Sequence, residues 1–131
     1  MKEARIIIAG SRSFNDYIKL KAAMYDTICD LKKSNGEELN IKIISGTARG
    51  ADKLGEKYAN EYGYEVVRFP ADWDRLGKRA GYVRNAEMAK YAVSDGSIGV
   101  LVACWDGASK GTKHMIDLAN KYGLEVLIVE F

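Results

Sequence analysis

Proline, histidine and cysteine are scarce in this chain of 131 residues, which has one proline, one histidine and two cysteines. Two cysteines do not make the disulfide framework of a small secreted protein, so we interpret Cys29 and Cys104 as buried free thiols. His114 is the single histidine, and the sequence contains no CxxC or HxxxH pair. These absences exclude the usual structural zinc sites, and we predict neither a bound metal nor a cofactor.

Long hydrophobic runs are also missing. The start of the chain, MKEARIIIAGSRSF, holds an apolar run of only five residues, from Ile6 to Gly10. Such a run is too short to span a membrane and is typical of a buried strand. We therefore expect no signal peptide, no membrane partner and a cytoplasmic location.

Neither sign of charge dominates, because 20 Lys and Arg oppose 18 Asp and Glu for a net charge of +2. A protein dedicated to duplex DNA or RNA usually carries a strong basic excess, so we do not expect a nucleic-acid partner. A local cationic pocket remains compatible with this balance. The hydrophobic fraction of 47% and the charged fraction of 29% are typical of a soluble globular protein. We expect residues 1–131 to form a single domain.

Strand-like and helix-like segments alternate from one end of the chain to the other. Apolar runs predict strands at residues 5–9, 41–45, 65–69, 98–104 and 125–129. Helical spacing predicts helices from residue 17 to the stop at 34–36, at 51–62, at about 78–93 and at 111–122. The expected buried stripe of the third helix is Tyr82, Ala86, Ala89 and Val93. This order predicts an α/β fold: a Rossmann-like, three-layer α/β/α domain with a parallel five-stranded sheet.

Three loops rich in Gly and Ser follow the first, second and fourth predicted strands, at residues 10–13, 46–52 and 106–112. In a parallel sheet such loops meet at the carboxyl edge, where ligands bind. Glycine lets the backbone approach a ligand closely, and the helix that follows each loop directs its positive end toward the same space. Gly and Ser also make ordinary turns and helix caps. Three such loops at one edge favour an anion-binding pocket, although none matches GxGxxG or GxxxxGK[ST].

A fourth loop, at residues 69–85, mixes aromatic, acidic and basic side chains. Trp73 could stack on a nucleotide base, while Arg79 and Arg84 could hold phosphate or ribose oxygens. Alternatively, Trp73 caps the core and the basic residues pair with Asp72 and Asp74 on the surface. The residues of this loop leave both interpretations open.

A series of short motifs resembles the YspA-type branch of the SLOG superfamily. The motifs are Gly-Ser-Arg (10–12), Ser-Gly-Thr-Ala-Arg-Gly-Ala-Asp (45–52), Phe-Pro-Ala-Asp-Trp (69–73), Ala-Gly-x-x-Arg-Asn (80–85) and Trp-Asp-Gly-x-Ser-x-Gly-Thr (105–112). The resemblance extends from residue 5 to about residue 129. It implies a Rossmann-like fold and a pocket for nucleotides or their N-glycosidic derivatives, since the superfamily includes LOG phosphoribohydrolases, DprA proteins and sensors of nucleotide signals.

The resemblance also bears on catalysis. Arg84-Asn85-Ala86-Glu87-Met88 is similar to the Arg-Lys-x-x-Met motif of LOG enzymes, which implies that Arg84 matches a catalytic arginine. Met115 stands where those enzymes carry an acidic residue. Cleavage of an N-glycosidic bond needs a carboxylate near the sugar, and only Asp52, Asp74 or Asp106 could replace it. The comparison therefore favours binding over hydrolysis.

We predict that the partner is a nucleotide or an ADP-ribose-like small molecule. Hydrolysis of nucleoside monophosphates, with Arg84 catalytic, is the alternative, and single-stranded DNA processing is a third. A homodimer or higher homo-oligomer also remains open, because Tyr58, Tyr62, Tyr91 and Tyr122 could form a dimer face or pack the sheet. The predicted ligand-binding residues are Gly10, Ser11, Arg12, Ser45, Gly46, Thr47, Arg49, Gly50, Asp52, Trp73, Asp74, Arg79, Arg84, Asn85, Asp106, Gly107, Ser109, Gly111 and Thr112.

Overall fold

The computed structural model describes residues 2–131 and contains a parallel five-stranded sheet in the order β3-β2-β1-β4-β5. Its strands are β1 (Glu3–Gly10), β2 (Asn40–Ser45), β3 (Glu65–Arg68), β4 (Ile98–Trp105) and β5 (Glu125–Glu130). The helices are α1 (Tyr17–Asn35), α2 (Ala51–Tyr62), α3 (Trp73–Leu76), α4 (Ala80–Val93) and α5 (Lys110–Tyr122). Single 3₁₀ turns occupy Gly77–Arg79 and Ser94–Gly96.

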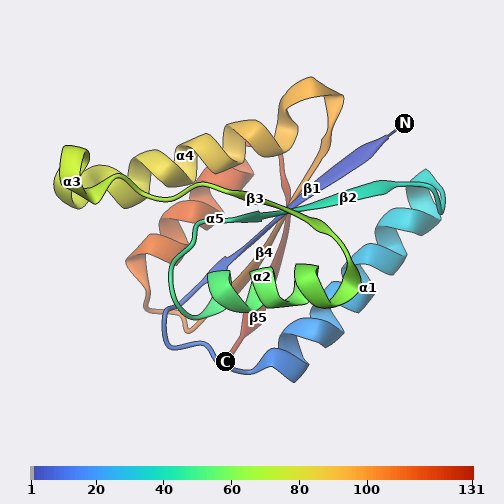
Figure 1. Ribbon diagram of the computed structural model, residues 1–131, viewed down its shortest axis with the longest axis horizontal. Helices are drawn as coiled ribbons and strands as arrows, with labels where there is room; N and C mark the ends of the chain where they lie inside the picture. Colours follow the sequence, from blue (N-terminus) through green and yellow to red (C-terminus); the bar gives the residue numbers. More distant parts are fainter. Residues whose placement is uncertain (1) are drawn as a thin grey trace.

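Helices cover both faces of the sheet, as the alternating sequence pattern predicts (Figure 1). Buried side chains of α1 and α2 pack on one face, and those of α4 and α5 pack on the other. The Rossmann-like three-layer fold is therefore confirmed. No helix among residues 2–131 is long and apolar enough to cross a membrane.

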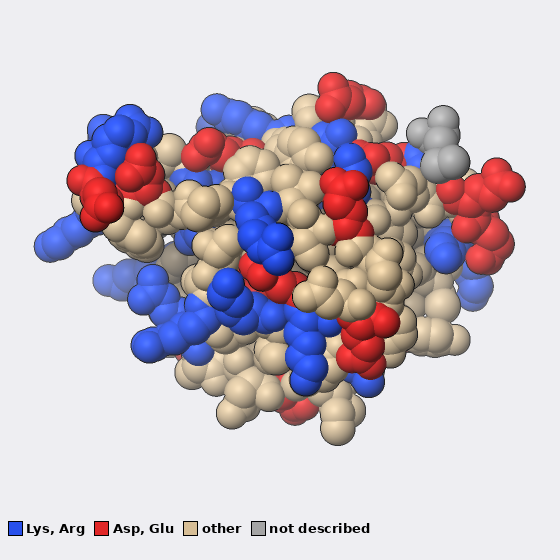
Figure 2. Space-filling view, in the orientation of Figure 1, with Lys and Arg blue, Asp and Glu red and all other residues tan. Residues whose placement is uncertain are grey.

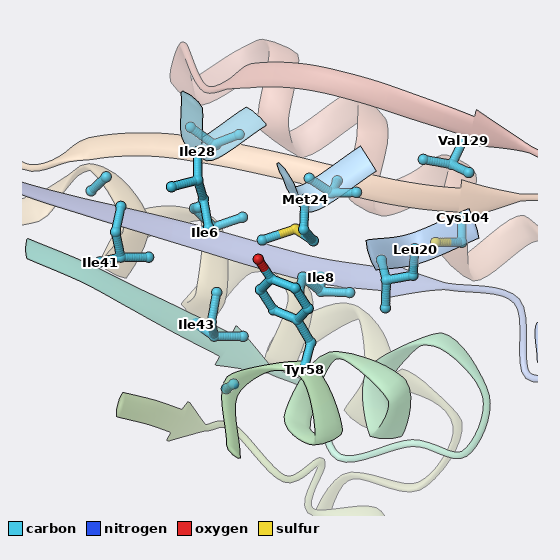
Figure 3. Packing of buried hydrophobic residues seen from close by; sticks show 14 of the residues in the cluster. Ile6, Ile8, Leu20, Met24, Ile28, Ile41, Ile43, Tyr58, Cys104 and Val129 are labelled. Carbon is cyan, nitrogen blue, oxygen red and sulfur yellow. The ribbon is translucent and has the colours of Figure 1, made fainter. Parts of the chain in front are cut away.

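The central strand β1 is buried on both sides, which explains its uninterrupted apolar run. Successive side chains of a strand point to opposite faces, so Ile6 and Ile8 join the layer of α1 and α2. Ile7 and Ala9 join the layer of α4 and α5. Figure 3 shows Ile6 and Ile8 lying among side chains that include Tyr58. The rigid centre of the sheet thereby fixes where the loop after β1 begins.

Two segments differ from the sequence prediction. Residues 73–76 form the short helix α3, which begins where Asp72 accepts a hydrogen bond from the Arg75 amide at 3.2 Å. On α4 the buried side chains include Asn85 and Met88, whereas Tyr82 is 45% exposed. The predicted stripe is wrong at Tyr82 because the first turn of α4 lies beside a cavity at the sheet edge, where an apolar residue does not have to face the core.

The edge strand β5 is less buried than its sequence suggests. Leu127 is 39% exposed and Ile128 is 40% exposed. A strand at the edge of a sheet has one neighbour, here β4, and its apolar run therefore receives less cover than the runs of the central strands. The expectation of a fully buried strand holds for β1 and β4 but not for β5.

Candidate functional site

A pocket of about 740 Å³ lies at the carboxyl edge of the sheet. The chain leaves β1 and β4 in opposite directions across the sheet, and this reversal of strand order opens a crevice between their loops. The side chains and backbone that line it come from the loops after β1, β2, β3 and β4 and from the helices that follow. They are Ala9, Gly10, Ser11, Arg12, Ser13, Ala48, Arg49, Asp52, Trp73, Lys78, Gly81, Tyr82, Arg84, Asn85, Met88, Asp106, Ser109, Gly111, Thr112 and Met115.

The structure brings most of the sequence-predicted ligand-binding residues to this place. Gly46 and Thr47 line an adjoining lobe instead, beside Arg12 and Arg84. The predicted residues in the main pocket are Gly10, Ser11, Arg12, Arg49, Asp52, Trp73, Arg84, Asn85, Asp106, Ser109, Gly111 and Thr112.

Five predicted residues line neither cavity. Ser45 and Gly50 lie behind the wall, where they shape the loop after β2. Asp74 is exposed on α3, and Arg79 is exposed just before α4. Gly107 is exposed in the turn after β4, where its φ of +82° suits glycine. Their sequence neighbours face the pocket, but a tight loop turns alternate residues away from it.

The loop after β1 is held against two other segments by close backbone contacts. The Ser11 amide donates to the Cys104 carbonyl at 3.0 Å. A Cβ on Gly50 would lie 2.5 Å from the Ser11 carbonyl oxygen, so glycine is required there. The Ser11 hydroxyl is buried and has no hydrogen-bond partner of good geometry among residues 2–131. It nevertheless lies close enough to Asp106 to help lower the pKa of that carboxyl.

A buried carboxylate that the sequence did not single out, Glu56, holds the loop after β2. The Ser45 hydroxyl donates to it at 2.6 Å, and Arg68 donates to it at 3.2 Å. Burial opposes ionisation of Glu56, but these two hydrogen bonds outweigh it and lower its pKa. Ser45 in turn accepts from the amide of Thr47 at 3.0 Å, which fixes the unusual φ of +66° at Thr47. The only feature of the sequence that could have pointed to Glu56 is its position one helical turn after Asp52 on α2.

Asp106 organises the loop after β4. Its carboxylate accepts from the amides of Ala108, at 2.9 Å, and Ser109, at 2.8 Å. These two bonds lower the pKa of the Asp106 carboxyl. Ser109 then caps α5 by accepting from the Thr112 amide at 3.4 Å. The loop thereby places the first turn of α5, the positive end of the helix, at the pocket.

Arg84 and Asn85 on α4 connect the loops after β2 and β4. Arg84 donates through Nη1 to the Gly46 carbonyl and through Nε to the Asn85 side-chain oxygen at 3.1 Å. Asn85 Nδ2 donates to the Gly111 carbonyl at 3.4 Å and lies 3.2 Å from His114 Nδ1. A Cβ on Gly46 would lie 2.7 Å from Arg84 Nη1, so glycine permits this contact. The adjacent pair therefore ties α4 to both loops, and Arg84 adds a positive charge to the lining.

Asp52 is the buried carboxylate of the pocket, with 5% of its surface exposed. Burial raises its pKa to about 6, although the hydrogen bond from the Ala48 amide and the charge of Arg84 act in the opposite direction. The Ala48 bond measures 3.1 Å. Asp52 therefore has an accepting oxygen in the pocket and changes charge just below neutral pH.

Positive side chains outnumber carboxylates in the lining. Arg12, Arg49, Lys78 and Arg84 contribute cations, whereas Asp52 and Asp106 contribute carboxylates. Figure 2 shows Lys and Arg gathered on the left of the visible face, around the strand ends and the start of α2. A cavity walled by charges of one sign concentrates ligands of the opposite sign. The net charge of the whole chain is close to zero and therefore does not reveal this local excess of positive charge.

Two aromatic rings complete the outer wall. Trp73 is 49% exposed and Tyr82 is 45% exposed. Tyr82 meets His114 edge to face with ring centroids 4.5 Å apart, which links this wall to α5. The sequence placed Tyr82 in the core and overlooked Ala9, Ser13, Ala48, Lys78, Gly81 and Met88 as lining residues. Met115 is buried and lines the pocket, so it contributes an apolar side chain to the wall.

Comparison with known proteins agrees with this architecture. Residues 4–76 match the sequence profile of a family described as YspA, cpYpsA-related SLOG. The chain is 30% identical over 128 residues to the Gene 61 protein of Mycobacterium phage D29, and the match covers 94% of both chains. No solved structure matches significantly. The chain belongs to the YspA, cpYpsA-related SLOG family.

Proposed function

We propose that this protein binds a phosphate-bearing nucleotide, or a small molecule derived from one, at the carboxyl edge of its sheet. One observation carries the proposal: four cationic side chains, the first turns of α2 and α5, and two exposed aromatic rings line a single pocket. Its volume of about 740 Å³ lies within the range of roughly 300–1,000 Å³ for small-molecule sites.

The phosphate end of the ligand is assigned to the side of α5. Gly111 and Thr112 belong to the first turn of this helix of 13 residues, where the amides attract an anion. The buried Ser11 hydroxyl has no partner among the described residues and can donate to a phosphate oxygen. Arg84 adds a positive charge from the neighbouring helix α4.

The base and the sugar are assigned to the outer wall and to α2. Trp73 and Tyr82 expose their rings beside the pocket, and every nucleobase offers a flat face for stacking. The Asp52 carboxylate can accept a hydrogen bond from a ribose hydroxyl, because its one protein hydrogen bond leaves further acceptor positions free. Asp74, which the sequence also predicts to bind the ligand, lies outside the lining.

Binding is best tested by calorimetric titration of the four ribonucleoside 5′-monophosphates and the four matching nucleosides. We expect at least one monophosphate to bind at least roughly tenfold more tightly than its nucleoside, because charge-assisted hydrogen bonds hold the phosphate. Arg84→Ala should weaken that binding by roughly tenfold or more. Arg75→Ala is the matched control, since Arg75 pairs with Asp72 on its own short helix and does not line the pocket. Equal binding of nucleosides and monophosphates, or no binding of any, contradicts the proposal.

One observation supports hydrolysis of a nucleoside monophosphate as a second candidate: Asp52 is a buried carboxylate in the same pocket as Arg84. A carboxylate there could stabilise positive charge on a sugar during cleavage of the N-glycosidic bond, which Met115 cannot do. An assay that measures the release of free base by chromatography distinguishes hydrolysis from binding alone. Base release that is lost in Asp52→Asn supports hydrolysis, while tight binding without release leaves binding alone.

A further inference from the structure

A second cavity of about 400 Å³ opens beside the main pocket, and we call it the arginine lobe. It shares Arg12, Ala48, Arg49, Trp73 and Arg84 with the main pocket, so the two spaces are continuous. Its full lining is Arg12, Gly46, Thr47, Ala48, Arg49, Pro70, Ala71, Trp73 and Arg84. No acidic residue is among them, in contrast to the main pocket.

Two backbone amides of this lobe are already paired. The Thr47 amide donates to Ser45 and the Ala48 amide donates to Asp52. The guanidinium groups are therefore the strongest donors that the lobe offers to an anion. No salt bridge among residues 2–131 involves Arg12, Arg49 or Arg84. Their positive charges are available to an anion.

The fold forces two of these arginines together. Gly50 directly follows Arg49, and a Cβ on Gly50 would lie 2.6 Å from the Arg12 carbonyl oxygen. The loops after β1 and β2 are thus in backbone contact at the lobe. Arg84 is placed by its bonds to the Gly46 carbonyl and to Asn85. Burial lowers the pKa of Arg84 and the charge of Asp52 raises it, while the nearby charge of Arg12 lowers it further, so two like charges lie close together here.

We infer that the arginine lobe binds a second phosphoryl group of the ligand, so that the preferred ligand is a nucleoside diphosphate or a derivative of one. This inference rests on the proposed nucleotide function. Guanidinium groups pair with phosphoryl oxygens in a bidentate manner, and three of them around one cavity suit a dianionic group. A monophosphate that occupies the α5 side and pairs with Arg84 would leave the charges of Arg12 and Arg49 unneutralised.

The test compares each ribonucleoside monophosphate with its diphosphate by calorimetric titration, in buffer with EDTA and physiological salt. For the base that binds best, we expect the diphosphate to bind at least roughly tenfold more tightly than the monophosphate. Arg12→Ala and Arg49→Ala should each reduce this ratio severalfold. Lys78→Ala is the matched control within the site, because Lys78 lines the main pocket but not the lobe. It should weaken both ligands by a similar factor and leave the ratio unchanged.

The outcomes separate this inference from the proposed function. Tight binding of monophosphates with no gain from the second phosphoryl group overturns the lobe and leaves the proposed function intact. In another outcome, the diphosphate keeps its tighter binding in Arg12→Ala and Arg49→Ala, or Lys78→Ala reduces the affinity ratio as much as they do. Either result assigns the tighter binding to general electrostatics and overturns the inference about the lobe. Absence of binding by both series overturns both proposals.

Discussion

A single carboxylate shows how strongly the fold changes the chemistry of a residue. Asp52 would be an ordinary acid on an exposed helix, but burial in the pocket wall raises its pKa to about 6 from the usual 3.8. At a pH between these two pKa values, Asp52 keeps its proton in the folded protein and releases it in the unfolded chain. Asp52 therefore favours folding at low pH, and this contribution is lost as the pH rises through about 6.

We expect Asp52→Asn to stabilise the protein relative to the wild type at pH 8 but much less at pH 4. A pKa difference of this size corresponds to a change of about 2–3 kcal/mol in the free energy of unfolding, at about 1.4 kcal/mol per pKa unit. Urea unfolding at both pH values measures it. Asp26→Asn, on the exposed side of α1, is the control for the same change of side chain. If the free energies of unfolding of Asp52→Asn and the wild type differ by the same amount at both pH values, the prediction is contradicted.

At the scale of elements, the site depends on how the loop after β2 enters α2. Gly50 has a φ of +81° and lies against the carbonyl groups of Ser11 and Arg12. Gly63, at the end of the same helix, has a similar φ of +77° but nothing within 4 Å of the position of a Cβ. The two glycines share a positive φ, but their ψ values of −128° at Gly50 and 24° at Gly63 differ, and so does the space around them.

Alanine substitutions at these two glycines should have different costs. Gly63→Ala should destabilise the protein by about 1 kcal/mol, because only the left-handed conformation is penalised. Gly50→Ala should destabilise it by at least about twice as much, because its backbone, with a ψ of −128°, suits glycine alone and the new methyl group also pushes the loop after β1 away. Nucleotide binding should weaken only in Gly50→Ala. Chemical denaturation and calorimetry measure both quantities, and equal losses of stability would show that the contact at Gly50 is not tight.

At the scale of the whole molecule, one chain supplies an entire pocket, with a lining drawn from β1, the loops after β1, β2, β3 and β4, and the helices α2–α5. The tyrosines proposed for a dimer face are mostly used inside the chain. Tyr58 is buried, and Tyr91 and Tyr122 pack against the core, whereas Tyr62 is 49% exposed. A homodimer remains a prediction, but the site does not depend on it.

We therefore expect one nucleotide per chain in a calorimetric titration, whatever the oligomeric state found by light scattering. A ligand that binds only the folded chain should also raise Tm by several degrees at about 100 times its Kd, which corresponds to about 2.7 kcal/mol. A stoichiometry of one nucleotide per two chains would instead indicate a site shared between protomers.

The sequence by itself determined the order of strands and helices, because apolar periodicity depends on local spacing and on which faces are buried. It also placed three glycine-rich loops at one edge, since parallel strands all end there. Helix ends at Gly63 and Gly123 followed from the same local rules, and both glycines adopt the left-handed conformation.

Only the tertiary structure decided which residues of those loops face the pocket. Ser45 and Gly50 turn inward to Glu56 and to the loop after β1, while Asp74 and Arg79 remain outside. Tyr82 faces the cavity because its helix passes the edge of the sheet. No local sequence pattern indicates that Arg12, Arg49 and Arg84 lie close together. They are up to 72 positions apart along the chain. Strand pairing and backbone contact between loops bring them to one place. Local patterns specify the elements, whereas the charge and shape of the site depend on contacts between residues far apart in the sequence.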